Sequence, residues 1–188
     1  MTLWRGPIHV VAFVGTDHHP FNRLVESVDA WFKSALETNL QITCMIQYGT
    51  STRPETAQGS AYLDRAGIES QLGLADIIVS HGGPSTIVEV LRSGKIPMVM
   101  PRDPSFGEHV DGHQQRFAAH MAKRGLITPI RSAGDLLAAF DTAMDGSRPE
   151  VIADADFPAP ADSAMRLAGL VEGLIRGRGS KGRNVSSR

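Results

Sequence analysis

The segment from Ser80 to Glu89 carries residue types that suit a nucleoside diphosphate. Its letters are SHGGPSTIVE, so two glycines, Gly82 and Gly83, come just before a predicted helix start. Glycines let phosphate approach the backbone closely, and the unpaired N–H groups at a helix N-terminus stabilise an anion. Glu89, one turn inside the helix, could accept both hydroxyls of a ribose. A turn, a helix cap and an acid that complements the helix dipole would give the same pattern, so both interpretations stay open.

A second polar segment, Gly15 to His19, follows the first predicted strand. Gly15 and Thr16 are placed where a phosphate or an acceptor group could approach the edge of a sheet. His18 and His19 could act as an acid or a base, because imidazole titrates near neutral pH. A loop histidine is also often only a solvated polar residue, so the two are candidates.

A third polar segment, residues 107–115, runs from a loop into a predicted helix. Its adjacent glutamines, Gln114 and Gln115, offer donors and acceptors that suit sugar hydroxyls, although an exposed helix start would look similar. Glu108, His109 and Asp111 have side chains that bind divalent metals. Their spacing matches no metal motif, so neither a metal nor a cofactor is expected.

Alternating strands and helices are expected to position these segments. Strands are predicted at residues 8–14, 42–46, 76–80, 96–100 and, more weakly, 126–130; helices at about 21–36, 68–74, 85–92, 113–123, 132–144 and 162–175; and a surface loop at 48–59. Parallel neighbours need a crossover, which the helices provide. The predicted fold is an α/β, doubly wound, Rossmann-like parallel sheet, with ligands at the carboxyl ends of its strands.

The predicted domain organisation has three parts. Residues 1–145 form the nucleotide-sugar-binding domain, residues 146–175 a linker and a helix that packs on it, and residues 176–188 a basic tail rich in Gly and Ser that we expect to be disordered.

Composition excludes several classes of protein. The 188 residues carry a formal net charge of -1, so no overall field favours nucleic acid or an anionic membrane surface. The only cysteine, Cys44, lies in an apolar run, which fits a reducing compartment and a buried, unreactive thiol. No signal peptide or spanning helix is indicated, so a soluble cytoplasmic protein is expected.

In combination, these segments resemble the C-terminal domain of family 28 glycosyltransferases. The likeness covers about residues 8–130 and depends on Val14-Gly15-Thr16, on residues 75–83 (ADIIVSHGG), on the Thr86 to Glu89 spacing and on His113-Gln114. It is greatest to the single-domain members, the donor-binding subunits of split N-acetylglucosaminyltransferases and of bacterial exopolysaccharide glycosyltransferases. The resemblance implies one half of a GT-B glycosyltransferase.

The resemblance also implies a UDP-sugar site, with the diphosphate at the start of the 85–92 helix, the ribose on Glu89 and the sugar on the glutamines. The implied donor-binding residues are Gly15, Thr16, His81, Gly82, Gly83, Ser85, Thr86, Glu89, His113, Gln114 and Gln115. Ala118 stands where the two-domain relative has an asparagine, which leaves the identity of the sugar open.

The implied reaction is an inverting transfer of a hexosyl unit to a lipid-linked or glycan acceptor, without an obligatory metal. His18 and His19 are candidates for the catalytic base, which could also come from a partner. The acceptor domain of full-length relatives is not in this sequence, so a separate subunit is expected, commonly membrane-anchored, and membrane contact would come only through it, at the inner face. A non-catalytic regulatory subunit that binds nucleotide sugars is the alternative, and a sugar epimerase or hydrolase ranks last.

Overall fold

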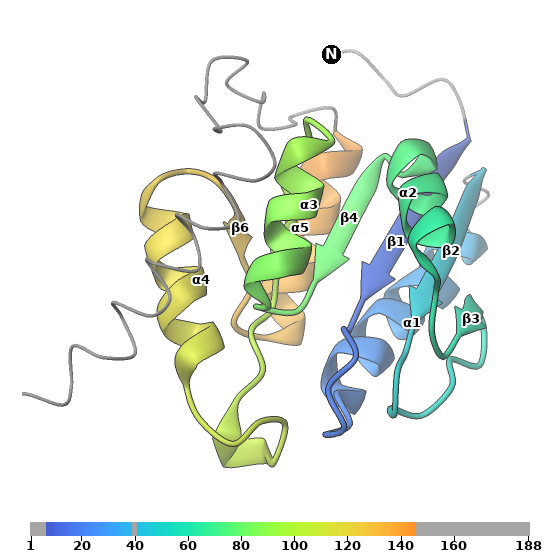
Figure 1. Ribbon diagram of the computed structural model, residues 1–188. Coiled ribbons are helices and arrows are strands. Elements are labelled where there is room, and N and C mark those ends of the chain that lie inside the picture. Colours follow the sequence, from blue (N-terminus) through green and yellow to red (C-terminus); the bar gives the residue numbers. More distant parts are fainter. Residues whose placement is uncertain (1–6, 39–40, 146–188) are drawn as a thin grey trace, which may run out of the picture. The chain divides into compact units, whose positions relative to one another are not determined.

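The computed structural model describes residues 7–38 and 41–145. Over these residues the chain forms a six-stranded sheet with strand order β3-β2-β1-β4-β5-β6, and every pair of neighbouring strands is parallel. Helices cover both faces of the sheet (Figure 1). This arrangement confirms the predicted doubly wound, Rossmann-like α/β fold. The predicted helix at 162–175 and the tail at 176–188 lie outside the described residues.

The described elements follow one another in strict alternation over most of the chain. They are β1 (Ile8–Phe13), α1 (Asn22–Glu37), β2 (Ile42–Gln47), β3 (Gln58–Ser60), α2 (Arg65–Leu74), β4 (Ile77–Ser80), α3 (Pro84–Arg92), β5 (Met98–Val99), the short 3₁₀ helix η1 (Pro104–Phe106), α4 (His113–Lys123), β6 (Thr128–Pro129) and α5 (Ala133–Met144).

The central strand β1 is apolar on both sides, as a strand between two helical layers requires. Val10 and Ala12 belong to the larger core cluster, which α1 and α5 cover. Val11 and Phe13 point the other way, into the smaller cluster with residues of α2, β4 and α3. This alternation explains why the run from residue 8 to 14 shows no polar face.

Helices α1 and α5 lie behind the sheet in Figure 1, whereas α2, α3 and α4 lie in front of it. The rings of Trp31 in α1 and Phe140 in α5 stack with their centroids 3.7 Å apart and their planes within 9° of parallel. Both side chains are buried. This stacked pair therefore fixes how the last described helix packs against the first.

The predicted strands differ from the observed ones mainly at the sheet edges. The loop predicted at 48–59 ends in β3, a three-residue edge strand whose polar letters, QGS, gave no strand signal. The strands predicted at 96–100 and 126–130 shorten to two residues each, β5 and β6. β5 pairs with β4 and with β6 over only two residues each, so the apolar runs overestimate the length of both strands.

The parallel register brings three strands to an end at the same level. Phe13 of β1 is paired with Gln47 of β2 and with Ser80 of β4. The segments that follow these strands therefore leave the sheet side by side, at the lower edge in Figure 1. This edge carries the polar segments that the sequence singled out.

Candidate functional site

The order in which the chain adds strands to the sheet reverses between β1 and β4. From β1 the chain builds β2 and β3 outward on one side, and then returns to place β4, β5 and β6 on the other side. In open α/β sheets, ligands bind in the crevice outside the carboxyl ends of the strands at such a point. Here the crevice lies between Gly15, after β1, and His81, after β4.

A cavity of about 240 Å³ opens in this crevice. It is open to solvent on one side, and it brings together seven of the predicted donor-binding residues from two segments that are more than sixty residues apart in the sequence. Its lining consists of Phe13, Gly15, Thr16, Gln47, Leu63, Ile68, His81, Gly83, Pro84, Ser85, Thr86 and Glu89. The first segment and the start of α3 therefore form the two walls of one site.

The N-terminus of α3 faces this cavity without a side-chain cap. Gly83 is the N-cap residue and Pro84 the first helical residue, whereas α2 and α5 are capped by the side chains of Asp64 and Ser132. Uncapped N–H groups at a helix start and the positive end of the helix dipole make a site for an anion. The interpretation as an ordinary side-chain cap does not fit this geometry.

The imidazole of His81 packs between Gly15 on one wall of the cavity and Gly83 on the other. Its ring is buried, and Nδ1 lies 3.3 Å from the carbonyl oxygen of Phe13. A Cβ added to Gly15 would lie 2.6 Å from Nε2 of His81, and one added to Gly83 would overlap the same atom. Both glycines are therefore required by the ring of His81, and Gly15 also by its positive φ of 83°. Burial, together with the charge of Arg102, lowers the pKa of His81 to about 4, so the ring is neutral at physiological pH.

Gln47 holds the Gly15 turn in place from the neighbouring strand. Its Oε1 accepts a hydrogen bond from the Gly15 N–H at 3.0 Å, and its Nε2 donates to the carbonyl oxygens of Gly15, at 3.0 Å, and Ala61, at 2.8 Å. The side chain is buried and lines the cavity. Sequence reasoning missed this residue, although a glutamine that ends a buried strand at the ligand edge is a usable signal.

Arg102 is the second positioning residue that the sequence did not reveal. It is completely buried, and its guanidinium donates to the carbonyl oxygens of Val14 at 2.9 Å, His19 at 2.6 Å and Glu108 at 3.0 Å. Through these bonds it ties the loop after β1 to the loop after β5. A buried arginine is tolerated where its donors find acceptors, and here backbone carbonyls supply them for both terminal nitrogens, whereas the Nε–H has no hydrogen-bond partner among the described residues.

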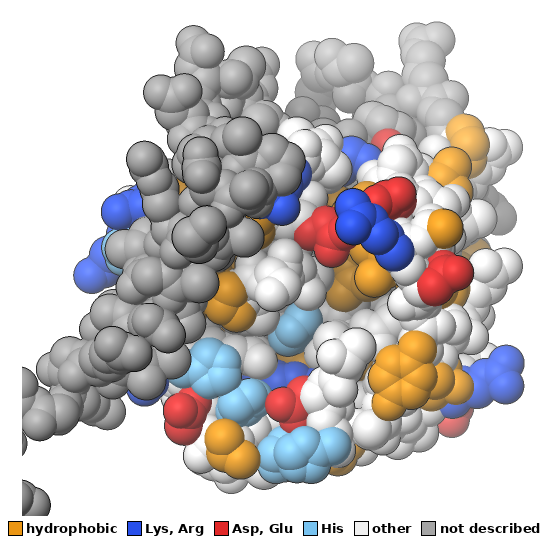
Figure 2. Space-filling model, in the orientation of Figure 1, with side chains coloured by type: hydrophobic (Ala, Val, Ile, Leu, Met, Phe, Trp, Pro, Cys, Tyr) orange, Lys and Arg blue, Asp and Glu red, His pale blue; other side chains and the backbone are white. Residues whose placement is uncertain are grey.

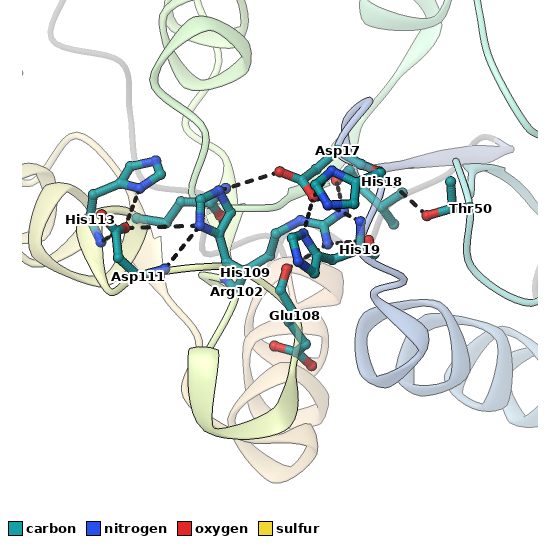
Figure 3. Close-up of polar contacts among 11 residues, drawn as sticks. Asp17, His18, His19, Thr50, Arg102, Glu108, His109, Asp111 and His113 are labelled. Carbon is teal, nitrogen blue, oxygen red and sulfur yellow. Dashed lines mark hydrogen bonds and ion pairs between the residues drawn. The ribbon is translucent and has the colours of Figure 1, made fainter.

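The two candidate catalytic histidines differ in how they are held (Figure 3). Nδ1 of His19 lies 2.7 Å from Oδ1 of Asp17, whereas the His18 ring is 82% exposed and its Nδ1 is 3.7 Å from the same oxygen. Burial alone would raise the pKa of Asp17, but hydrogen bonds from the His19 N–H and ring and the charge of Arg102 outweigh it and lower the pKa to about 2. Asp17 is therefore a fixed carboxylate that orients His19.

Histidine and acid side chains gather at the lower edge of the domain in Figure 2. The possible metal ligands Glu108, His109 and Asp111 do not come together there. Both carboxylate oxygens of Glu108 instead accept hydrogen bonds from Arg23, at 3.0 and 2.8 Å. His109 and Asp111 instead lie with His113, the first residue of α4. His113 was not counted in that set.

Comparison with known proteins identifies the family of this domain. The glycosyltransferase family 28 C-terminal domain matches residues 9–147, which is most of the chain. The chain belongs to this family.

Solved structures similar to this family 28 domain are GT-B glycosyltransferases. MurG of Acinetobacter baumannii aligns with a TM-score of 0.56 and 15% identity over 89% of this chain and 52% of its own. The glycosyltransferase of kitacinnamycin aligns with a TM-score of 0.51 and 22% identity, over 92% of this chain and 41% of its own. CalG4, the calicheamicin glycosyltransferase, aligns with a TM-score of 0.51 and 11% identity, over 93% of this chain and 42% of its own. These likenesses show the fold, that of one GT-B half, and the chain spans about half the length of each neighbour.

Four of the predicted donor-binding residues do not line the cavity of the family 28 domain. A Cβ on Gly82 would lie 2.9 Å from that of Gln114, so Gly82 serves the packing of α4 against the turn. Gln114 is buried, and its Oε1 accepts from the Arg102 N–H at 3.3 Å. Gln115 lines a second cavity of about 270 Å³, and His113 binds Asp111. Their predicted contacts with a donor stay predictions.

None of the helices within residues 7–38 and 41–145 is long and apolar enough to cross a membrane.

Proposed function

We propose that this family 28 domain binds a UDP-sugar and is the donor-binding, catalytic half of an inverting glycosyltransferase. One observation carries the proposal: the uncapped N-terminus of α3, Glu89 and the Gly15 turn line a single cavity at the switch point of the sheet. The choice of uridine comes from the family resemblance. The nucleotide titration described below tests it.

The cavity offers a separate group for each part of the donor. The backbone N–H groups of the first α3 turn, with the hydroxyls of Ser85 and Thr86, would hold the diphosphate. The Glu89 carboxylate, on the next turn of the same helix face, would accept hydrogen bonds from the ribose hydroxyls. Because His81 is neutral and buried behind this site, the anion is held by dipoles and N–H groups rather than by a cation.

The proposed reaction is a single displacement at the anomeric carbon. An acceptor hydroxyl oxygen forms the new glycosidic bond as the bond to the diphosphate oxygen breaks, and the hydroxyl proton passes to a base. The electron pair of the broken bond leaves on UDP. Preorganised N–H groups at α3 stabilise the charge that develops there, so no metal is required for this step.

Within this chain, His19 is better placed than His18 to be the base. Its Nδ1 lies 2.7 Å from Oδ1 of Asp17, so this carboxylate orients the ring and leaves Nε2 free of that contact. The His18 ring lies against it, with centroids 3.9 Å apart, and is exposed to solvent. The alternative is that a residue of the acceptor half takes the proton from the acceptor hydroxyl.

We further propose that the acceptor site is on a separate, membrane-anchored subunit, which would bring this domain to the inner face of a membrane. The support for this proposal is the resemblance to the single-domain donor-binding subunits of the family, whose acceptor domain is on another chain. The acceptor would then be lipid-linked or a glycan. The loop after β1 lines the cavity through Gly15 and Thr16, so we propose that the acceptor half approaches beside it.

Calorimetric titration of the full chain with UDP, GDP and dTDP, without added metal, tests donor binding. We expect UDP to bind more tightly than the other two. Equal binding of all three would remove the uridine assignment, and no binding of any, alone or with a co-expressed partner subunit, would contradict the donor-site proposal. Radiolabelled sugar transfer by the co-purified pair separates a transferase from a regulatory subunit, because the latter binds UDP-sugar and transfers nothing.

A further inference from the structure

The loop that leads into α4 brings three metal-binding side chains to one point on the rim of the domain. His109, Asp111 and His113 alternate along the chain, and one ligand atom from each lies within 4.8 Å of the others. Oδ1 of Asp111 is 3.9 Å from Nδ1 of His109 and 2.6 Å from Nδ1 of His113 (Figure 3). Ligand atoms that share an ion at about 2.0–2.1 Å are about 2.9–3.4 Å apart, so small side-chain rotations complete the set.

Asp17 fixes the tautomer of His109 that such a site requires. Its Oδ2 lies 3.3 Å from Nε2 of His109, which therefore carries the proton. Nδ1 on the other side of the ring then carries no proton, and it accepts a long hydrogen bond of 3.3 Å from the Asp111 backbone N–H, which a bound ion would replace. A carboxylate behind the far nitrogen of a ligating histidine is the usual arrangement around protein-bound metals.

Two further features favour a bound ion over a purely structural network. The imidazole of His109 is only 11% exposed, whereas Asp111 is 55% exposed, so the cluster is anchored at one end and open to solvent at the other. The His109 and His113 rings meet edge to face with centroids 4.5 Å apart, and one nitrogen of each ring lies within 4.8 Å of the other.

We propose that His109, Asp111 and His113 bind a divalent transition-metal ion such as Zn²⁺, with Asp17 as the residue that positions His109. Two imidazoles and one carboxylate suit Zn²⁺, whereas Mg²⁺ and Ca²⁺ prefer oxygen ligands alone. Three protein ligands leave a coordination position for water or for an oxygen of a bound molecule.

The ion would fix the loop before α4, which His109 already connects to the loop after β1 through Asp17. Asp17 directly follows Thr16, a residue of the cavity wall, so the site lies beside the mouth of the donor cavity. Arg102 ties the same two loops from inside the domain, through the carbonyls of His19 and Glu108.

Titration of the tag-free full chain with Zn²⁺, followed by calorimetry, tests the site, and the absorption spectrum of the Co²⁺ form reports its ligands. We expect one ion per chain and no comparable binding of Mg²⁺. His113→Ala should abolish this binding, and Asp17→Asn should weaken it about 10- to 100-fold, as loss of a positioning carboxylate does. His9→Asn, at the amino end of β1, is the matched control and should bind as the unmodified chain does.

Binding that is absent, that exceeds one ion per chain without saturation, or that survives His113→Ala would overturn the proposal. Binding that is lost in His18→Ala but kept in His113→Ala would move the ion to the Asp17–His18–His19 group and also overturn it. Circular dichroism of each variant shows that the fold is retained. UDP binding is measured without metal, so a negative result for the metal site does not affect the donor-site proposal, and a negative result for UDP does not affect the metal-site proposal.

Discussion

Lowering the pH from 7 to 5 should destabilise this domain through the buried imidazole of His81. The folded state holds the pKa of His81 at about 4, below the value of 6.5 in the unfolded chain. The unfolded state therefore binds the proton more readily, and stability falls as the pH drops below 6.5 until the loss is complete below pH 4. The shift is equivalent to about 3 kcal/mol in full, of which about 2 kcal/mol is lost between pH 7 and pH 5.

Urea denaturation at pH 7, 6 and 5, followed by circular dichroism, measures this loss. His81→Asn keeps a side-chain donor near the Phe13 carbonyl but cannot titrate, so its free energy of unfolding should fall by about 2 kcal/mol less than that of the unmodified chain over this range. His18→Asn, at the surface, is the matched control for the loss of an imidazole. Parallel curves for the unmodified chain and His81→Asn would refute the claim that the ring is buried and neutral.

Three further substitutions test the packing of the site and its support. Arg102→Met should lower the free energy of unfolding by at least about 3 kcal/mol, because three buried carbonyls lose their donor; a loss below about 1 kcal/mol would contradict this role. Phe140→Ala should cost about 3–5 kcal/mol by leaving a cavity beside Trp31. Leu137→Ala, at a half-exposed position of the same helix, should cost clearly less in the same urea experiment, and equal losses would show that the stacked pair is not the contact that matters.

Apart from β3, the order of the strands and α-helices was predictable because each of them carries a local signal. Apolar runs marked β1, β2 and β4, and Gly15 and Gly83 marked the turns that follow two of them. The parallel fold then required the ends of these strands to meet. For this reason the two walls of the cavity could be predicted from the sequence alone.

The roles of individual site residues were less predictable, because they depend on partners far away in the chain. Gly83 was expected to make room for phosphate, but its missing side chain also makes room for the ring of His81. A Gly83→Val variant would therefore displace His81 as well as block phosphate. It is a weaker test than removal of the Glu89 carboxylate.

The interior contacts of Arg102 and Glu108 carried no sequence signal. Arg102 follows the apolar run after β5 and resembles an exposed loop residue, yet it is completely buried. Glu108 resembled a metal ligand until Arg23, eighty-five positions away, was seen to bind it. Long-range ion pairs of this kind become visible only once the chain is folded.

The central claim is that Glu89 binds the ribose of a uridine nucleotide in the cavity at the start of α3. Its most direct test is the calorimetric affinity of UDP for Glu89→Ala, compared with Glu26→Ala, in which an exposed acid of α1 is removed. Glu89→Ala should weaken UDP binding by about 1.5–3 kcal/mol, or roughly 10- to 150-fold, and Glu26→Ala should leave it unchanged. Equal UDP affinity in the two variants would contradict the central claim.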